Sequence, residues 1–216
     1  MEPQALVHTD ADVMEGIALV NVLMLTRYDR SGASSRLRML QYADALSAED
    51  MAASDGPFFD ESYLARLYSG QSVLTPTASA YVRRFRQLRA ATRADAAWLE
   101  KEALPWLPWP IERALLPRRV PMIVDFDDAV FHRYDMHRSA LVRRLLGRKL
   151  DRLMASAALV TAGNQYLADR ARKAGARRVE IVPTVVDVSV YGRSPVSRTS
   201  GPAVIGWIGT PSTWSD

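Results

Sequence analysis

The chain has 216 residues, of which 48% are hydrophobic and 24% are charged, and its formal net charge is +4. This composition is typical of a folded globular protein and argues against a disordered chain. No apolar run approaches the roughly 20 residues that a membrane-spanning helix needs. The acidic segment 1–16 does not fit a secretory signal peptide. We therefore predict a cytoplasmic protein.

The sequence contains no cysteine and three histidines, His8, His132 and His137. Disulfides and thiolate metal sites are therefore excluded, and few ligands remain for zinc. We predict no metal and no cofactor, so that catalysis would depend on oxygen ligands, carboxylates or backbone amides. Nearly all of the basic residues are arginines. Either an anionic partner or the base composition of the genome explains this enrichment.

The first part of the chain predicts a strand, a loop and a helix. The apolar run from Ile17 to Thr26 is typical of a buried strand, and the polar turn from Arg27 to Ser35 follows it. A helix is expected next, with Ser34 or Ser35 as its N-cap. Segment 51–55 occupies the place of a second strand, although its residues are poor strand formers.

The remaining pattern alternates between strands and helices. Strands are expected over 94–100, 120–126, 157–161 and 179–182, and helices over 58–68, 78–92, 139–154 and 166–174, with a short helix ending near 116. Such alternation predicts right-handed crossovers and a parallel sheet with helices on both faces. We therefore predict an α/β fold of Rossmann-like type.

The composition also indicates a division of the chain. Residues 1–16 are predicted to be a polar extension, 17–187 a Rossmann-like domain, and 188–202 a linker rich in Ser, Gly and Pro. Residues 203–216 contain an apolar strand followed by a turn of small residues, which we expect to open a second domain.

Ligands of open parallel sheets bind at the carboxyl ends of the strands, where segments 27–35, 125–128 and 161–165 should meet. The first of these contains a glycine and the start of a helix, an arrangement that suits a phosphate. An ordinary strand-to-helix turn is an equal alternative. The candidate phosphate-binding residues of this loop are Ser31, Gly32, Ser34, Ser35 and Arg36.

Asp125, Asp127 and Asp128 crowd three carboxylates at the end of one predicted strand. Their mutual repulsion requires a cation, a proton or an arginine nearby. Such clustering indicates a functional site. The structural alternative is that an aspartate caps a helix or pairs with Arg133 or Arg138.

The predicted helix 139–154 has a basic face with Arg144, Arg148 and Arg152, and an apolar face that includes Leu141 and Leu145. The basic face suits contact with anionic lipid headgroups, with a solvated face as the alternative. No nucleic-acid-reading motif accompanies these arginines, so we predict no nucleic-acid partner.

Three segments, Ile123–Phe131, Ile181–Tyr191 and Ile205–Thr213, together resemble a group 1 (family four) glycosyltransferase of the GT-B fold. The second segment is similar to the family's Pro-Asn-Gly-Val-Asp-x-x-x-Phe hinge signature, with Thr184 and Val185 in place of Asn and Gly. The resemblance extends from about Val20 to the end of the sequence.

The resemblance implies transfer of a sugar from a nucleotide-sugar donor to a glycan or lipid acceptor, usually with retention, in a cleft between two Rossmann-like domains. The chain would supply the acceptor side, either free in the cytoplasm or peripheral at the inner face of the membrane. Asp127 and Asp128 would contact the catalytic centre. The residues near the donor would be those of the 31–36 loop with Asn164, Gly209, Thr210 and Pro211.

In that family the cations that neutralise the leaving diphosphate, and a paired-glutamate motif, lie downstream of the position matching Asp216. We therefore expect the 216 residues alone to behave as an inactive fragment.

Two alternatives stay open. Segment 124–128 resembles the Asp-x-Asp opening of haloacid-dehalogenase-type phosphatases, in which the first aspartate is a nucleophile and Mg²⁺ is bound, although Ala129 replaces the usual threonine. The other alternative is a non-catalytic module that binds an anionic glycolipid.

Overall fold

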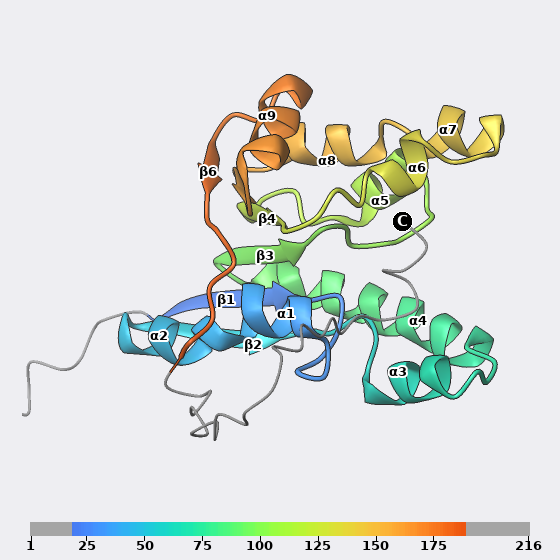
Figure 1. Ribbon diagram of the computed structural model, residues 1–216. Helices are drawn as coiled ribbons and strands as arrows, with labels where there is room; N and C mark the ends of the chain where they lie inside the picture. Colours follow the sequence, from blue (N-terminus) through green and yellow to red (C-terminus); the bar gives the residue numbers. More distant parts are fainter. Residues whose placement is uncertain (1–18, 189–216) are drawn as a thin grey trace, which may run out of the picture. The chain divides into compact units, whose positions relative to one another are not determined.

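The computed structural model describes residues 19–188, and its contacts divide the chain after Val185 (Figure 1). The part up to Val185 contains a six-stranded, all-parallel sheet of order β2-β1-β3-β4-β5-β6. The strands are β1 (Val20–Leu25), β2 (Met51–Asp55), β3 (Ala96–Glu100), β4 (Met122–Phe126), β5 (Leu159–Ala162) and β6 (Val179–Ile181). The predicted α/β Rossmann-like fold is thereby confirmed.

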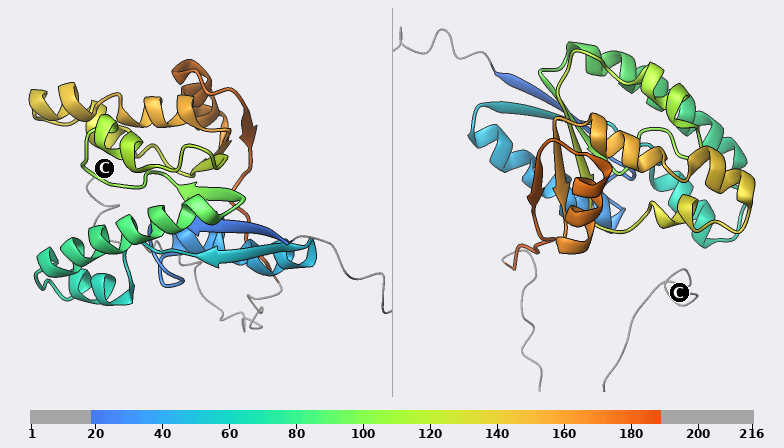
Figure 2. Two further views of the ribbon diagram at one scale, coloured as in Figure 1. Left: turned by 180° about the vertical axis from the view of Figure 1, so that it is seen from behind. Right: turned by 90° about the horizontal axis from the view of Figure 1, so that it is seen from above.

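Helices connect the strands. They are α1 (Ala33–Arg38), α2 (Ala43–Ala48), α3 (Glu61–Tyr68), α4 (Leu74–Ala90), α5 (Trp109–Leu115), α6 (His132–Asp135), α7 (Ala140–Leu146), α8 (Lys149–Ser156) and α9 (Gln165–Ala174), with 3-10 turns at Leu40–Tyr42 and Ala91–Arg93. Figure 2 shows α4, α5 and α8 along one face of the sheet and α1 and α2 on the other. No helix within 19–188 is both long enough and apolar enough to cross a bilayer.

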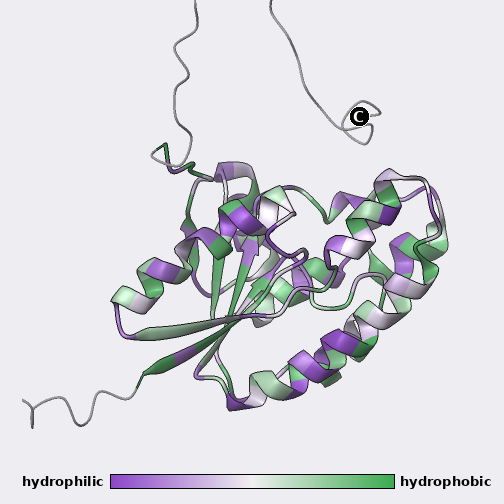
Figure 3. Cartoon of the chain, turned by 90° about the horizontal axis from the view of Figure 1, so that it is seen from below, coloured by the Kyte–Doolittle hydropathy of each residue, from purple (hydrophilic) through white to green (hydrophobic). Residues whose placement is uncertain are grey.

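Strand β1 divides its side chains between the two faces with the period of two that strands impose. Val22 and Met24 pack with Met39 on the side of α1, whereas Leu25 belongs to the larger core that includes Leu99. Figure 3 shows the strands largely green and the surrounding helices banded in purple and green. The sheet core therefore fixes the strand ends, where the polar residues of the next section lie.

Segment 51–55 forms β2 in spite of its weak strand propensity. It pairs in parallel with β1, from Val20 opposite Met51 to Met24 opposite Asp55. Because β2 is an edge strand with several exposed side chains, backbone pairing and the preceding helix hold it in place. Tertiary context thus overrides local propensity here.

The single helix predicted over 139–154 is wrong, since α7 ends at Leu146 and α8 begins at Lys149. Gly147 is the turning point: a Cβ there would lie 2.4 Å from the Arg143 carbonyl oxygen, and the next residue leaves helical geometry with φ −108°. The break allows the Lys149 side chain to enter the core.

The break also changes which leucines are buried. Leu146 is buried, as are Leu150 and Leu153 of α8. Leu141 and Leu145, predicted to lie on the same apolar face, are instead 64% and 54% exposed. Helix α7 therefore presents two leucines to solvent beside its arginines.

Candidate functional site

Residues from three neighbouring strands meet at the carboxyl edge of the sheet. Because β1, β3 and β4 are adjacent, the helix after β1 brings Ser34 beside Glu100, the last residue of β3, and beside Asp127, which follows β4. The Ser34 hydroxyl lies 3.0 Å from Glu100 Oε1 and 2.5 Å from Asp127 Oδ2. We call Ser34, Glu100, Lys101, Asp127 and Asp128 the rim cluster.

Lys101 is the cation of the rim cluster. Its Nζ lies 3.0 Å from Asp127 Oδ1, 3.0 Å from Asp128 Oδ2 and 4.0 Å from Glu100 Oε1. The Lys101 side chain is 6% exposed, whereas that of Asp128 is 58% exposed. The ammonium therefore sits beneath carboxylates, one of which faces solvent.

The backbone turns sharply at Lys101, which has φ +61°. A non-glycine residue in this left-handed region costs about 1–3 kcal/mol. The amide of Glu102 donates to the carbonyl of Glu100 across the turn, at 2.7 Å. Because of this turn, Lys101 faces the rim cluster while Glu102 enters the interior.

The pKa values of Asp127 and Lys101 move in the directions expected of an ion pair. Burial alone would raise the pKa of Asp127, but attraction to Lys101 and the hydrogen bond from Ser34 outweigh it and hold the pKa below its usual value. Burial would lower the pKa of Lys101, but attraction to Asp127, Asp128 and Glu100 raises it. Asp127 is thus held ionised.

The three aspartates predicted to repel one another are separated by their partners. Arg38 binds Asp125 with two hydrogen bonds, of 2.9 and 2.5 Å, and Thr161 donates to the same carboxylate at 2.5 Å. Asp127 and Asp128 share Lys101 instead. Neither pairs with Arg133 or Arg138 in the described part of the chain, so the compensating cations are Arg38 and Lys101.

The loop predicted to bind phosphate has its hydroxyls engaged elsewhere. Ser35 donates to Glu100 Oε2 at 2.6 Å, and Ser31 donates to Asp29. The Arg36 guanidinium donates to the carbonyl of Arg30 at 2.8 Å. Two serines of this loop therefore face carboxylates, which would repel a phosphate. A phosphate role for the loop stays a prediction.

The N-cap prediction for this loop is wrong. Gly32 is the N-cap of α1, and Ser34 and Ser35 lie inside the first turn. Their side chains reach across the sheet edge to Glu100 instead of back to the helix amides. Gly32 is required for close approach, because a Cβ there would lie 2.3 Å from the Tyr28 Cβ.

Four further residues were predicted to lie near the donor. One of them caps a helix, and the other three lie outside the described residues. Asn164 is the N-cap of α9 and accepts a hydrogen bond from the amide of Leu167 at 3.0 Å. Gly209, Thr210 and Pro211 lie outside the described residues. Asn164 therefore has a structural task whatever else it binds.

Sequence reasoning missed Glu100, Lys101 and Glu102. Glu100 is the last residue of β3, and Lys101 and Glu102 directly follow it. Strand β3 lies between β1 and β4, whose ends were considered together with that of β5. The rule that ligands bind at the carboxyl ends of parallel strands would have found them if it had been applied to β3 as well.

A second, buried charge cluster lies behind the rim cluster. Lys149 Nζ is 2.7 Å from Glu102 Oε2 and 2.7 Å from Glu112 Oε2, and it donates to the carbonyl of Leu104 at 2.6 Å. The Tyr134 hydroxyl lies 3.0 and 2.9 Å from the two oxygens of Glu102. This inner cluster ties the β3 turn to α5, α6 and α8.

Burial dominates the titration of the inner cluster. It raises the pKa of Glu112, and attraction to Lys149 only partly opposes the rise. Burial and repulsion from Glu102 likewise raise the pKa of Tyr134. Tyr134 therefore stays protonated at neutral pH and acts as a hydrogen-bond donor.

Within residues 19–188, no group of three or more His, Asp and Glu side chains is arranged to hold a metal ion. In the comparisons with known proteins, no family model matches the chain and no curated protein sequence matches it significantly.

Proposed function

We propose that the chain is the acceptor-side domain of a glycosyltransferase, which transfers a sugar from a nucleotide-sugar donor to an acceptor hydroxyl. One observation carries the proposal: Asp127 and Asp128 flank Lys101 at the carboxyl edge of the sheet, beside the loop after β1. These are the two aspartates that the family resemblance implies to be in contact with the catalytic centre.

The charge of the rim cluster favours a hydroxylated ligand there. Its three carboxylates and one ammonium carry a formal charge of −2. A phosphate would be repelled, whereas the hydroxyl groups of a sugar can donate to carboxylate oxygens. Asp128, with 58% of its side chain exposed, is placed to accept such hydrogen bonds.

The two aspartates would serve in different ways. Because the pKa of Asp127 is held below its usual value, that carboxylate is a poor proton acceptor at neutral pH. It would therefore fix Lys101 and Ser34 and orient a sugar hydroxyl without taking its proton. Asp128 would contact the acceptor more directly.

Departure of a nucleoside diphosphate requires cationic groups near the leaving oxygens. Lys101, the cation of the rim cluster, is held by two carboxylates. The proposal therefore assigns the leaving-group contacts to a second domain, which would close over this edge of the sheet.

The phosphatase alternative is less well supported. Its nucleophile would be Asp125, but that carboxylate is 1% exposed and both of its oxygens accept hydrogen bonds from Arg38. A nucleophilic carboxylate must have an oxygen that is free to attack phosphorus. The geometry at Asp125 favours a structural role.

The test is to express the coding sequence extended past Asp216 beside the 216-residue chain. Release of nucleoside diphosphate from a panel of nucleotide sugars is then measured for both. We expect release from the extended protein alone. Turnover by the 216-residue chain would contradict the assignment of the leaving-group contacts to a second domain. Mg²⁺-dependent hydrolysis of a phosphate ester that is lost in Asp125→Asn would favour the phosphatase.

Contact with a membrane surface is a second part of the proposal. Helix α7 exposes Leu141 and Leu145 one turn apart, and the arginines at 143 and 144 are exposed on the same helix. Exposed leucines beside arginines suit insertion among anionic headgroups. We expect the chain to sediment with phosphatidylglycerol vesicles, and we expect Leu141→Ser with Leu145→Ser to reduce this binding.

The matched control is Val82→Ser, which changes an exposed apolar residue of α4. It should leave vesicle binding unchanged. Equal binding by the α7 double variant and the parent would exclude α7 as the contact.

A further inference from the structure

Two arginines from different elements converge on one glutamate beside the rim cluster. Arg27 follows β1, and Arg133 belongs to α6. Their Nη1 atoms lie 3.7 and 3.9 Å from Glu102 Oε1. The side chains of Arg27 and Arg133 are 14% and 37% exposed, so Arg133 is the more accessible of the two.

Glu102 is already neutralised without these arginines. Lys149 lies 2.7 Å from its Oε2, and the Tyr134 hydroxyl bonds to the carboxylate from the other side. The contacts of Arg27 and Arg133 with Glu102 are longer than a good ion pair requires. Their hydrogen-bonding capacity is therefore directed at Glu102 but not satisfied by it.

The local charge favours an anion at this place. The two carboxylates of Glu102 and Glu112 face three cations, Lys149, Arg27 and Arg133, so the group carries a formal charge of +1. The neighbouring rim cluster has the opposite sign. A ligand that lies across both regions would need an anionic group at one end and hydroxyl groups at the other.

An aromatic wall of Tyr28, Phe59 and Tyr63 lies beside Arg27. The Arg27 guanidinium lies 5.8 Å from the ring centroids of both Tyr28 and Phe59, and Phe59 stacks on Tyr63 at 3.7 Å. Burial raises the pKa of Tyr63, and Arg27 and Arg133 oppose this rise. Phe59 is 5% exposed, so its packing with Tyr28 and Tyr63 supports Arg27 from the interior.

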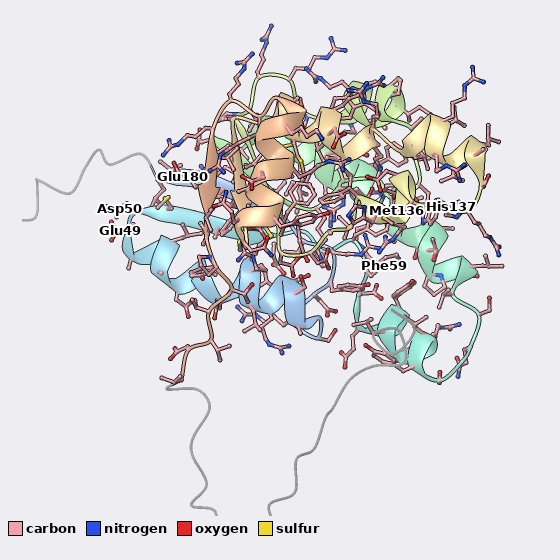
Figure 4. The ribbon with its side chains drawn as sticks, turned by 45° about the horizontal axis from the view of Figure 1, so that its top comes forward. Glu49, Asp50, Phe59, Met136, His137 and Glu180 are labelled. Carbon is pink, nitrogen blue, oxygen red and sulfur yellow. The ribbon has the colours of Figure 1, made fainter. Side chains whose placement is uncertain are left out.

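The two sides of this region come from distant parts of the sequence. Figure 4 shows Phe59, which follows β2, on the same side of the molecule as Met136 and His137, which follow α6. Glu49 and Asp50, at the amino end of β2, are labelled on the opposite side. The arginines and the aromatic wall thus share the carboxyl edge of the sheet with the rim cluster.

We propose that Arg27 and Arg133 bind a phosphate monoester, and that the acceptor is accordingly a phosphorylated sugar whose hydroxyls reach Asp128. Two guanidinium forks can surround a phosphate with charge-assisted hydrogen bonds, which a single lysine cannot do. The assignment of this phosphate to the acceptor rests on the proposed function. Binding of the phosphate itself does not.

The test is calorimetric titration of the 216-residue chain at fixed ionic strength, without any nucleotide sugar. The probes are glucose 6-phosphate, glucose and uridine diphosphate. We expect glucose 6-phosphate to bind, glucose to bind at least about tenfold more weakly, and Arg27→Gln and Arg133→Gln each to weaken glucose 6-phosphate about tenfold or more.

Three further variants sharpen the test. Arg133→Lys keeps the charge but loses the fork, so an intermediate loss is expected. Arg89→Gln removes an exposed arginine before β3, at the other end of the sheet, and should change the dissociation constant less than about twofold. Since Arg133 is partly exposed, its variants should keep the parent's melting curve.

The proposal is overturned if glucose 6-phosphate does not bind, or if it binds Arg133→Gln as it binds the parent. If uridine diphosphate alone binds, and this binding is lost in the same variants, the assignment of the phosphate to the acceptor is overturned. Arg27 and Arg133 would then bind the donor. Because no sugar transfer is measured, failure here leaves the transferase proposal standing. Failure of transfer would equally leave the phosphate site intact.

Discussion

The ammonium of Lys101 lies 3.0 Å from a carboxylate oxygen of Asp127 and 3.0 Å from one of Asp128. Lys101 is thus held in its left-handed turn by two residues that follow the adjacent strand, β4. The bridge joins the ends of β3 and β4, so the three side chains that hold this edge together are also those to which the proposed function assigns sugar binding.

Lys101→Met should lower the free energy of unfolding by about 2–3 kcal/mol at pH 7, since it leaves Asp127 partly buried without a cation. Urea denaturation measures the loss. The matched control is Lys173→Met on the exposed surface of α9, which should change stability by less than about 0.5 kcal/mol. Equal stability of the two variants would show that the bridge contributes nothing.

The same bridge predicts a pH window. The pKa of Asp127 is lowered on folding, so its contribution is present above the unfolded value near 4 and is lost as pH falls through the folded value. The pKa of Lys101 is raised, so its contribution is present below the unfolded value of about 10.4 and is lost as pH rises through the folded value.

The stability difference between the parent and Asp127→Asn should therefore be constant between about pH 5 and 9 and shrink at both ends. Urea titrations at a series of pH values give this difference directly. A difference that grows in acid would contradict the assigned pKa direction.

Lys149→Met should destabilise the protein by about 3–5 kcal/mol, because it leaves Glu102 and Glu112 buried without their shared cation. Adding Glu102→Gln and Glu112→Gln removes the uncompensated charges. The triple variant should therefore recover a substantial part of the loss, as a melting-temperature series would show. A further loss of stability in the triple variant would mean that hydrogen bonding, not charge, dominates the inner cluster.

Arg84→Met should stabilise the protein by about 1–2 kcal/mol at pH 7. Arg84 is completely buried, donates to the carbonyl of Thr26 at 2.5 Å and leaves Nε and Nη1 without hydrogen-bond partners. Burial lowers its pKa to about 9, so the unfolded chain binds the proton more tightly. The advantage of the variant should thus shrink above pH 9, and a destabilised variant at pH 7 would contradict this.

The sheet could be predicted because its strands are apolar and its helices have regular periodicity. Two regions depend on contacts that local propensity does not encode. The strand expected at 51–55 from its place in the pattern forms by pairing with β1, although its residues are poor strand formers. The break after Leu146 depends on burial of Lys149 between two glutamates that are distant in sequence.

The site was predicted in part for a similar reason. Asp127 and Asp128 stand out because acidic residues cluster after an apolar strand. Lys101 and Arg27 do not stand out, because a single cation in the sequence carries no sign of what it faces. The pairing of Arg38 with Asp125 spans 87 residues, and only the order of the strands brings the two together.

The most direct measurement is the rate of nucleoside diphosphate release from a nucleotide sugar by the full-length gene product, compared among Asp127→Asn, Asp128→Asn and Asp169→Asn. Asp169 is exposed on α9, away from the rim cluster, and serves as the control. We expect both rim variants to lose roughly 100-fold in rate, and the control to stay within about twofold. Rim variants as fast as the parent would contradict the assignment of sugar transfer to this edge of the sheet.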